Sequence, residues 1–190
     1  MQVKMSWVGF FLSCLLTFET AHGLTLSGIL GFGGSTSSNE SQKQEGPFVQ
    51  TFALEKLLNS RFALGVEHIR SLSSGLSTSM GFTGLLTRFY LNAAPVPLFK
   101  VEDLSTTDLS YRDYSLFLAI GGGFAQSSSL PDPDGKSSNA AGLYFSPRVG
   151  VDYQLGASLG ARGELLIAMT LVGKGQISTM SLGAGIYYFF

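Results

Sequence analysis

The sequence predicts an all-β fold: an eight-stranded, antiparallel, up-and-down transmembrane β-barrel with a filled polar lumen. Eight segments alternate between apolar residues and small or polar residues with a period of two, which is the periodicity of a β-strand. Hydrophobic residues make up 45% of the chain and charged residues only 13%, about half the usual charged share. No apolar run after residue 23 could form a membrane-spanning helix, so a membrane-bound chain would have to be a closed barrel.

The first 23 residues have the pattern of a cleaved secretory signal peptide. One lysine precedes an apolar run from Trp7 to Phe18, and small residues stand at the positions before a cut after Gly23. The run is about twelve residues long, too short for a spanning helix of roughly 20. An uncleaved anchor and lipidation at Cys14 are the alternatives, and the apolar run continues past Cys14. We therefore expect a signal peptide at 1–23 and one barrel domain, free of cysteine, at 24–190.

The strands follow from the alternation. In each of them the apolar register is predicted to face lipid and the small or polar register to face the lumen. An even number of strands places both termini on one side of the membrane. The predicted ranges are 24–34, 48–57, 61–72, 78–92, 114–125, 143–153, 158–170 and 178–190.

The connections are predicted to differ between the two sides. Polar segments at 35–46 and 126–140 read as long extracellular loops, and 58–60 and 155–157 read as short periplasmic turns. The segment 93–113 fits poorly, because it contains two prolines and several charges where a short turn is expected. We expect it to form a long turn or a strand extension beyond the membrane.

Two strands carry specific expectations. Pro147 removes a ladder hydrogen bond, so we expect a bulge or a rim position there. In the strand 78–92, Arg88 is predicted to lie outside and to reach the head groups at the periplasmic surface, although Leu85 and Phe89 blur the alternation. The outward residues predicted for this strand are Met80, Phe82, Leu86 and Tyr90.

The last thirteen residues, 178–190, carry the most specific motif. Counted back in twos, Phe190, Tyr188, Ile186 and the residues before them are apolar. This pattern resembles the C-terminal signature of bacterial outer-membrane barrels, and the chain resembles the small OmpA/OmpX-like barrels of Gram-negative bacteria. The resemblance implies an outer-membrane location and makes Tyr188 and Phe190 the signal for the barrel-assembly machinery. With Tyr90 and Tyr153 they are also predicted to form an outward aromatic girdle.

Charged residues in the register opposite the apolar one form the main candidate constellation. Side chains can fill the lumen of an eight-stranded barrel, and charges buried there must pair. We therefore expect a structural ion-pair network, with a conducting path or a ligand site as alternatives. Its predicted members are Glu55, Arg61, Glu67, Arg148, Asp152, Arg162 and Glu164.

His68 is the only histidine after the predicted signal peptide and falls in the outward register beside Arg70, near the extracellular rim. We expect these two residues either to contact lipopolysaccharide phosphates or simply to form part of a solvated rim. The alternative is catalysis, because a lipid A-modifying barrel enzyme needs a nucleophile, a histidine base and an orienting acid. Serines such as Ser71 lie nearby in the sequence, but a serine-rich loop explains them as well.

The expected function is that of a non-enzymatic outer-membrane protein with a structural or surface-interaction role through its loops. A narrow pore, a lipid A-modifying enzyme and a soluble lipocalin-like barrel remain as alternatives. We expect no cofactor and no metal. After residue 23 the chain has one histidine and no cysteine, which cannot supply the usual zinc ligands, and the glycine-rich stretches lack Walker spacing. The net charge of −1 argues against nucleic acid. The expected partners of this monomer are outer-membrane lipid, lipopolysaccharide and the assembly machinery.

Overall fold

A computed structural model describes residues 23–37, 48–72, 78–92, 94–95, 114–129, 139–156, 158–172 and 175–190. They form eight β-strands, and no helix among them is long and apolar enough to cross a membrane. Each predicted strand end lies within four residues of the observed one. The strands are β1 (Leu24–Ser37), β2 (Phe48–Leu57), β3 (Phe62–Leu72), β4 (Thr78–Tyr90), β5 (Tyr114–Ser129), β6 (Asn139–Gln154), β7 (Leu159–Val172) and β8 (Gly175–Phe189).

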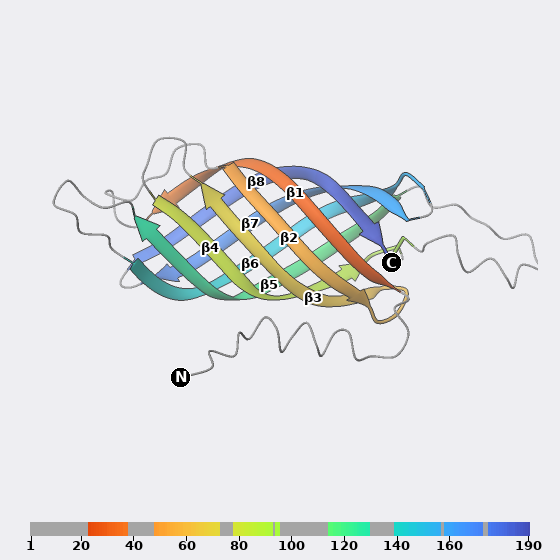
Figure 1. Cartoon of the computed structure of the whole chain (residues 1–190), viewed down its shortest axis with the longest axis horizontal. Coiled ribbons are helices and arrows are strands. Elements are labelled where there is room, and N and C mark those ends of the chain that lie inside the picture. Colours follow the sequence, from red (N-terminus) through yellow and green to blue (C-terminus); the bar gives the residue numbers. More distant parts are fainter. Residues whose placement is uncertain are drawn as a thin grey trace, which may run out of the picture.

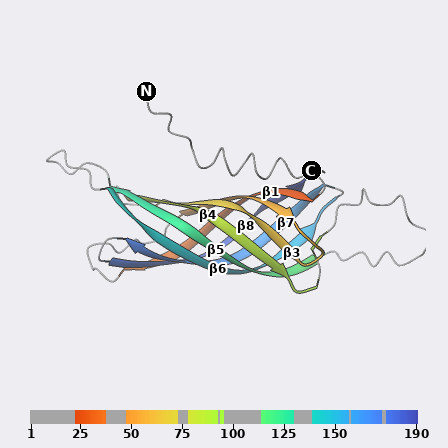
Figure 2. The ribbon, with the colours of Figure 1, turned by 90° about the horizontal axis from the view of Figure 1, so that it is seen from below.

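The strands form one closed barrel, which confirms the predicted architecture. Each strand pairs antiparallel with the next, and β8 closes the barrel against β1. Figures 1 and 2 show the strands tilted and wound around a common axis. Following paired residues once around the barrel leads from Ser27 to Ser37, a shift of ten residues along β1. A barrel of eight tilted strands is narrow enough for side chains to fill.

The two ends of the barrel are distinguished by their connections. The end that carries the C-terminus and the short turns at 58–61 and 155–158 is called the turn end, and the opposite one the loop end (Figure 1). Asn59 stabilises the first turn, since its Oδ1 accepts from the backbone N–H groups of Arg61 and Phe62 at 2.9 Å each. Gly23 precedes β1 with a φ of 93°, and its carbonyl accepts from Leu57 N–H at 2.8 Å. Both contacts fix the start of a strand at the turn end.

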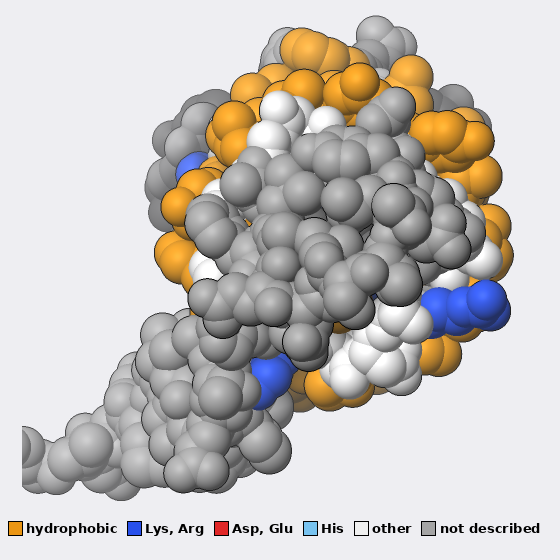
Figure 3. All heavy atoms as spheres, turned by 90° about the vertical axis from the view of Figure 1, so that its right-hand side faces the viewer, with side chains coloured by type: hydrophobic (Ala, Val, Ile, Leu, Met, Phe, Trp, Pro, Cys, Tyr) orange, Lys and Arg blue, Asp and Glu red, His pale blue; other side chains and the backbone are white. Residues whose placement is uncertain are grey.

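The outer wall is apolar and the lumen contains the charges, as predicted for seven of the eight strands. Side chains such as Phe32, Phe124 and Leu182 are 71%, 72% and 69% exposed. Figure 3, a view from the turn end, shows hydrophobic side chains around the rim of the wall. Large apolar residues therefore face outward on all sides of the barrel.

The prediction for β4 was wrong, because this strand faces the other way. Its predicted outward residues are buried in the lumen, whereas Leu85 is 48% exposed. Both registers of β4 contain large apolar residues, and the loop end of the lumen is itself apolar, so hydrophobicity does not distinguish the two faces. The residues that turn inward are Met80, Phe82, Leu86, Arg88 and Tyr90.

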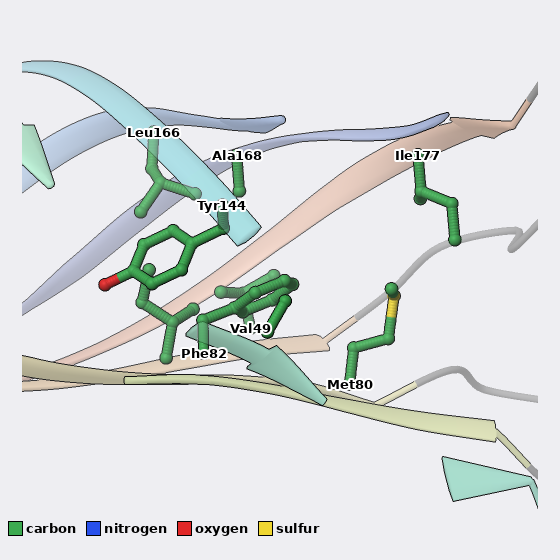
Figure 4. Packing of buried hydrophobic residues seen from close by; sticks show 9 residues of the cluster. Val49, Met80, Phe82, Tyr144, Leu166, Ala168 and Ile177 are labelled. Atoms are coloured by element: carbon green, nitrogen blue, oxygen red, sulfur yellow. The ribbon is translucent and has the colours of Figure 1, made fainter. Parts of the chain in front are cut away.

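A cluster of apolar side chains fills the loop end of the lumen (Figure 4). Phe82 and Tyr144 pack with their ring centroids 5.4 Å apart and their planes tilted by 54°. This group is called the apolar plug. Its members are Val49, Ile69, Met80, Phe82, Ala125, Tyr144, Leu166, Ala168 and Ile177.

Pro147 occupies neither a bulge nor a rim. On one side it pairs with Ile120 of β5 within an unbroken ladder. On the other side the ladder omits Ser146 and Pro147, yet Phe145 pairs with Met169 and Arg148 with Leu166 in the same register. Each strand therefore contributes two unpaired residues, and no extra residue is inserted as a bulge would require.

Some expectations fall wholly or mostly outside the described residues. These are the signal peptide at 1–23, except Gly23, and most of the two long loops. Of the segment 93–113, Ala94 and Pro95 are described and are buried at the turn end. Ala94 N–H donates to the carbonyl of Ser60 at 2.7 Å, which attaches this segment to the neighbouring turn.

Candidate functional site: the charged lumen

Four charged residues form a cluster in the turn half of the lumen, called the turn-side cluster: Glu55, Arg88, Asp152 and Arg162. The Arg162 guanidinium donates Nε to Asp152 Oδ1 at 2.6 Å and Nη2 to Oδ2 at 2.8 Å, a bidentate pair. Its Nη1 donates to Glu55 Oε1 at 2.8 Å. Arg88 donates Nε and Nη2 to the same carboxylate at 2.7 and 3.0 Å. Two cations and two carboxylates thus balance each other within one chain of contacts.

Neutral residues complete the turn-side cluster. Tyr90 donates its hydroxyl to Asp152 Oδ2 at 3.0 Å, and Ser27 accepts from Arg162 Nη1 at 3.1 Å. The Arg88 guanidinium carbon lies 3.9 Å from the centroid of the Phe117 ring, a cation–π distance. Side chains from five strands (β1, β2, β4, β5 and β6), together with Arg162 of β7, therefore meet in this cluster.

A second cluster, the loop-side cluster, lies farther from the turns and consists of Glu67, Arg148 and Glu164. Arg148 Nη2 donates to Glu67, and its Nη1 lies 3.5 Å from Glu164 Oε1. Glu67 Oε1 also accepts from the hydroxyl groups of Tyr144 at 2.9 Å and Ser146 at 3.3 Å. All three charged side chains are at most 2% exposed. Tyr144 connects this cluster to the apolar plug.

The structure places six of the seven predicted lumen charges in these two clusters. Arg61 is the exception: it is exposed in the turn before β3, because the strand begins only at Phe62. Arg88 was missed, since it was assigned to the outer wall together with the rest of its strand. Charge balance is a weak signal for it, because the sequence assigns three arginines and four carboxylates to the lumen, and only the structure shows that Arg61 is not among them.

Glycines in the wall make room for these side chains. A Cβ added to Gly121 would overlap Glu67 and Ser146, one added to Gly150 would overlap the Phe117 ring, and one added to Gly160 would overlap the Tyr187 ring. The predicted explanation of the glycine-rich stretch 121–123, a crowded lumen rather than a phosphate-binding loop, agrees with this packing.

The outer wall carries the remaining candidates. His68 and Arg70 are exposed, as predicted, and His68 Nδ1 lies 2.9 Å from Thr83 Oγ1. Ser71 points into the lumen, away from His68. Every side-chain carboxylate of the described residues lies in the lumen, so among these side chains none can orient the imidazole as a catalytic acid would. No group of three or more His, Cys, Asp or Glu side chains in the described strands could hold a metal ion.

The C-terminal residues also lie on the outer wall, at the turn end. Tyr188 and Phe190 are exposed, and their rings pack edge to face with centroids 5.0 Å apart. Phe190 N–H donates to the carbonyl of Leu24 at 2.9 Å, which extends the contact between β8 and β1. Tyr153 is exposed as predicted, but Tyr90 is in the lumen and belongs to no outward girdle.

Comparison with known proteins gives structural neighbours only. No protein-family model and no curated protein matches the sequence. Neisserial surface protein A, NspA, matches with a TM-score of 0.68 and 13% identity, over 88% of this chain and 97% of that one. The outer membrane protein OprG from Pseudomonas aeruginosa matches with a TM-score of 0.52 and 11% identity, over 89% of this chain and 96% of that one. The N-terminal β-barrel domain of Pseudomonas aeruginosa OprF also has a TM-score of 0.52, with 12% identity over 89% and 99% of the two chains. The chain therefore has the fold of these small eight-stranded barrels over nearly their whole length.

Proposed function

We propose that this chain is an integral outer-membrane β-barrel protein with a closed lumen and a non-enzymatic role. The observation that carries the proposal is the inverted polarity of the barrel. Large apolar side chains are exposed on the outside of all eight strands, while every side-chain carboxylate of the described residues is buried inside. Soluble monomers rarely expose contiguous apolar patches of more than a few hundred Å². A soluble lipocalin-like barrel would need the opposite arrangement.

The orientation in the membrane is part of the proposal. The turn end would face the periplasm and the loop end the outside, as in barrels with short periplasmic turns and long outer loops. Exposed aromatic residues near the turn end support this, since such residues concentrate at membrane interfaces. They are Phe62, Tyr114, Tyr153, Tyr188 and Phe190. Any surface interaction would then fall to the loops at 35–46 and 126–140, and the segment 1–23 would direct export.

The closed lumen is proposed from its packing. The turn-side cluster, the loop-side cluster and the apolar plug follow one another along the axis, and most of their side chains are less than 5% exposed. A narrow pore would need a continuous path of water through these three layers. A structural or surface-interaction role therefore fits the barrel better than transport through it.

The test is whether the full chain, produced in a Gram-negative host, behaves as a membrane barrel. We expect it in the outer-membrane fraction, soluble only with detergent and migrating differently on gels before and after boiling. In planar bilayers the purified protein should give no stable single-channel conductance. Release in a soluble form would overturn the membrane location, whereas stepwise conductance from a membrane-inserted protein would overturn only the closed lumen.

Deletion of Phe190 tests the proposed assembly signal. The residue is 55% exposed, its ring packs edge to face on its neighbour Tyr188, and its backbone N–H donates to the carbonyl of Leu24. We expect export to continue but the level of heat-modifiable protein in the outer membrane to fall at least several-fold. The control is Leu155→Ala, which removes an equally exposed apolar side chain from a turn at the same end. Normal membrane levels of the truncated protein would contradict the proposed signal.

A further inference from the structure

Polar side chains gather on the outer wall of four adjacent strands, β2 to β5. Gln50 pairs with Arg70, Arg70 with Gly81, and Gly81 with Gln126, so these four residues form one row across the wall. His68 and Thr83 pair in the next row on the same face, two residues closer to the turn end. This group is called the outer-wall polar patch, and its side chains are those of Gln50, His68, Arg70, Thr83 and Gln126.

The patch interrupts the apolar band of the wall. On β3 the outward residues between the turn end and His68 are only Phe62, Leu64 and Val66. They cover about 13 Å of strand, well short of the roughly 25 Å height of the apolar band in membrane barrels. On β6 the outward register stays apolar from Tyr153 to Leu143. The loop half of β3 is therefore polar from His68 to Arg70, whereas β6 carries leucine and phenylalanine in its loop half. Exposed Phe52 and Phe124 flank the His68–Thr83 row on the neighbouring strands β2 and β5.

Arg70 has no counter-charge in the described part of the chain. It is exposed on the outer wall, and all four described carboxylates are in the lumen, at most 3% exposed. An arginine that faces lipid without an anionic partner destabilises a barrel, most strongly near the middle of the bilayer. An anionic, hydrogen-bonding group that covers Arg70 would offset this cost.

The chemistry of the patch suits a phosphate group. The planar guanidinium of Arg70 can donate two parallel hydrogen bonds to phosphate oxygens. The 2.9 Å contact with Thr83 engages Nδ1 of His68; where the threonine hydroxyl donates, the neutral imidazole carries its proton on Nε2 and can donate outward. The Gln50 and Gln126 amides add further donors. Gly81, beside Arg70 in the same row, has no side chain to cover the guanidinium, and a Cβ there would meet only His68, at 3.8 Å.

A second copy of this chain is a poorer occupant. A two-fold contact through the patch would bring the same surface of both copies together. Each copy would present Arg70 and His68, and no carboxylate of the described wall could neutralise them. A ligand that supplies negative charge fits the patch, whereas its own copy does not.

We propose that the outer-wall polar patch binds a phosphate group of a phosphorylated glycolipid, lipopolysaccharide, in the outer leaflet. The proposal rests on the membrane location and orientation proposed above. Phosphate binding would explain the interruption of the apolar band, because the lipid head groups would lie closer to the middle of the membrane along this face. The contact would fix the depth and the rotation of the barrel relative to these lipids.

The test uses the full chain, processed by the cell, purified from the outer membrane and placed in phosphatidylcholine nanodiscs. Two probes are compared, bis-phosphorylated lipid A and the same lipid A with its phosphates removed, and bound lipid is counted by native mass spectrometry. We expect the phosphorylated lipid to bind about tenfold more tightly, the effect of one charge-assisted contact. Arg70→Gln should abolish this preference and His68→Gln should reduce it, while Arg61→Gln, which removes an exposed arginine at the opposite end, should keep it.

The outcomes separate this proposal from the membrane location. Equal binding of the two lipids by the unaltered protein, or an undiminished preference in Arg70→Gln, overturns the phosphate site while the heat-modifiable membrane barrel stands. If Arg61→Gln lost the preference for the phosphorylated lipid as much as Arg70→Gln does, the preference would come from general charge attraction. That result would also overturn the site. Failure of the unaltered protein to reach the outer membrane overturns the proposed function, and the site with it.

Discussion

Replacing Arg162 with alanine is expected to lower the free energy of unfolding by about 3–5 kcal/mol, the cost of leaving buried charges without their partner. Arg162 is 2% exposed and makes ion pairs with both Asp152 and Glu55. Without it, Asp152 keeps only the Tyr90 hydroxyl among the contacts in this cluster, and Glu55 keeps Arg88. One of the two carboxylates would thus be buried with no cation beside it.

The measurement is a urea titration of the barrel refolded in phospholipid vesicles. Unfolding is monitored by the shift in gel mobility and by circular dichroism. Arg61→Ala is the matched control, because the sequence alone assigns both arginines to the lumen and the structure leaves Arg61 exposed in a turn. The control should change the unfolding free energy by less than about 0.5 kcal/mol, as for most surface substitutions. Equal effects of the two variants would contradict the structural role of the turn-side cluster.

Two further variants distinguish the loss of a cation from the loss of a side chain. The triple change Arg162→Met, Asp152→Asn and Glu55→Gln leaves Arg88 as the only charge of the cluster, whereas Arg162→Met with Asp152→Asn alone leaves Arg88 and Glu55 paired. The double variant should therefore be more stable than both Arg162→Ala and the triple variant. This order of stability would show that charge balance, rather than packing volume alone, stabilises the lumen.

The fold could be predicted from the sequence because the membrane and the lumen impose opposite polarities on alternate residues. Where the two faces differ sharply, as in β6 with Val149 and Val151 outside and Arg148 and Asp152 inside, the alternation identifies both. In β4 it does not, because Phe82 faces the apolar plug inside and Leu85 faces outward. A strand that lies between two apolar environments has no polarity contrast, so its facing depends on packing that the sequence does not display.

The pairing of the lumen charges could not be predicted for a different reason. Glu55 meets Arg88 and Arg162, which are 33 and 107 residues away in the chain. Which inward residues share a level depends on the ten-residue shift around the barrel, and this shift is set by the register of all eight strand pairs together. The sequence shows which residues point inward but not the height at which they meet.

Gly160→Ala is expected to lower the free energy of unfolding by about 1–3 kcal/mol, the usual cost of overpacking a filled interior. The added methyl group would overlap the ring of Tyr187, which is 0% exposed. The movement of Tyr187 is restricted, because its ring is buried, packs edge to face on Phe189 with centroids 5.1 Å apart and lies 5.3 Å from the Arg162 guanidinium carbon. A shift of the ring would therefore also disturb the turn-side cluster.

The control for this change is Gly163→Ala on the same strand. A Cβ at Gly163 would meet only Val151 Cγ1, at 3.7 Å, an ordinary van der Waals contact on the outer wall. Both substitutions exchange glycine for alanine in β7, so the change in backbone entropy is similar and cancels in the comparison. Urea titration in vesicles should give a clearly lower free energy of unfolding for Gly160→Ala than for Gly163→Ala. We expect the value for Gly163→Ala to match or exceed that of the unaltered barrel. Equal stability of the two variants would mean that the lumen beside Tyr187 has room for another methyl group. The lumen would then not be tightly filled at that level of the barrel, which would contradict the packing on which the closed lumen is proposed.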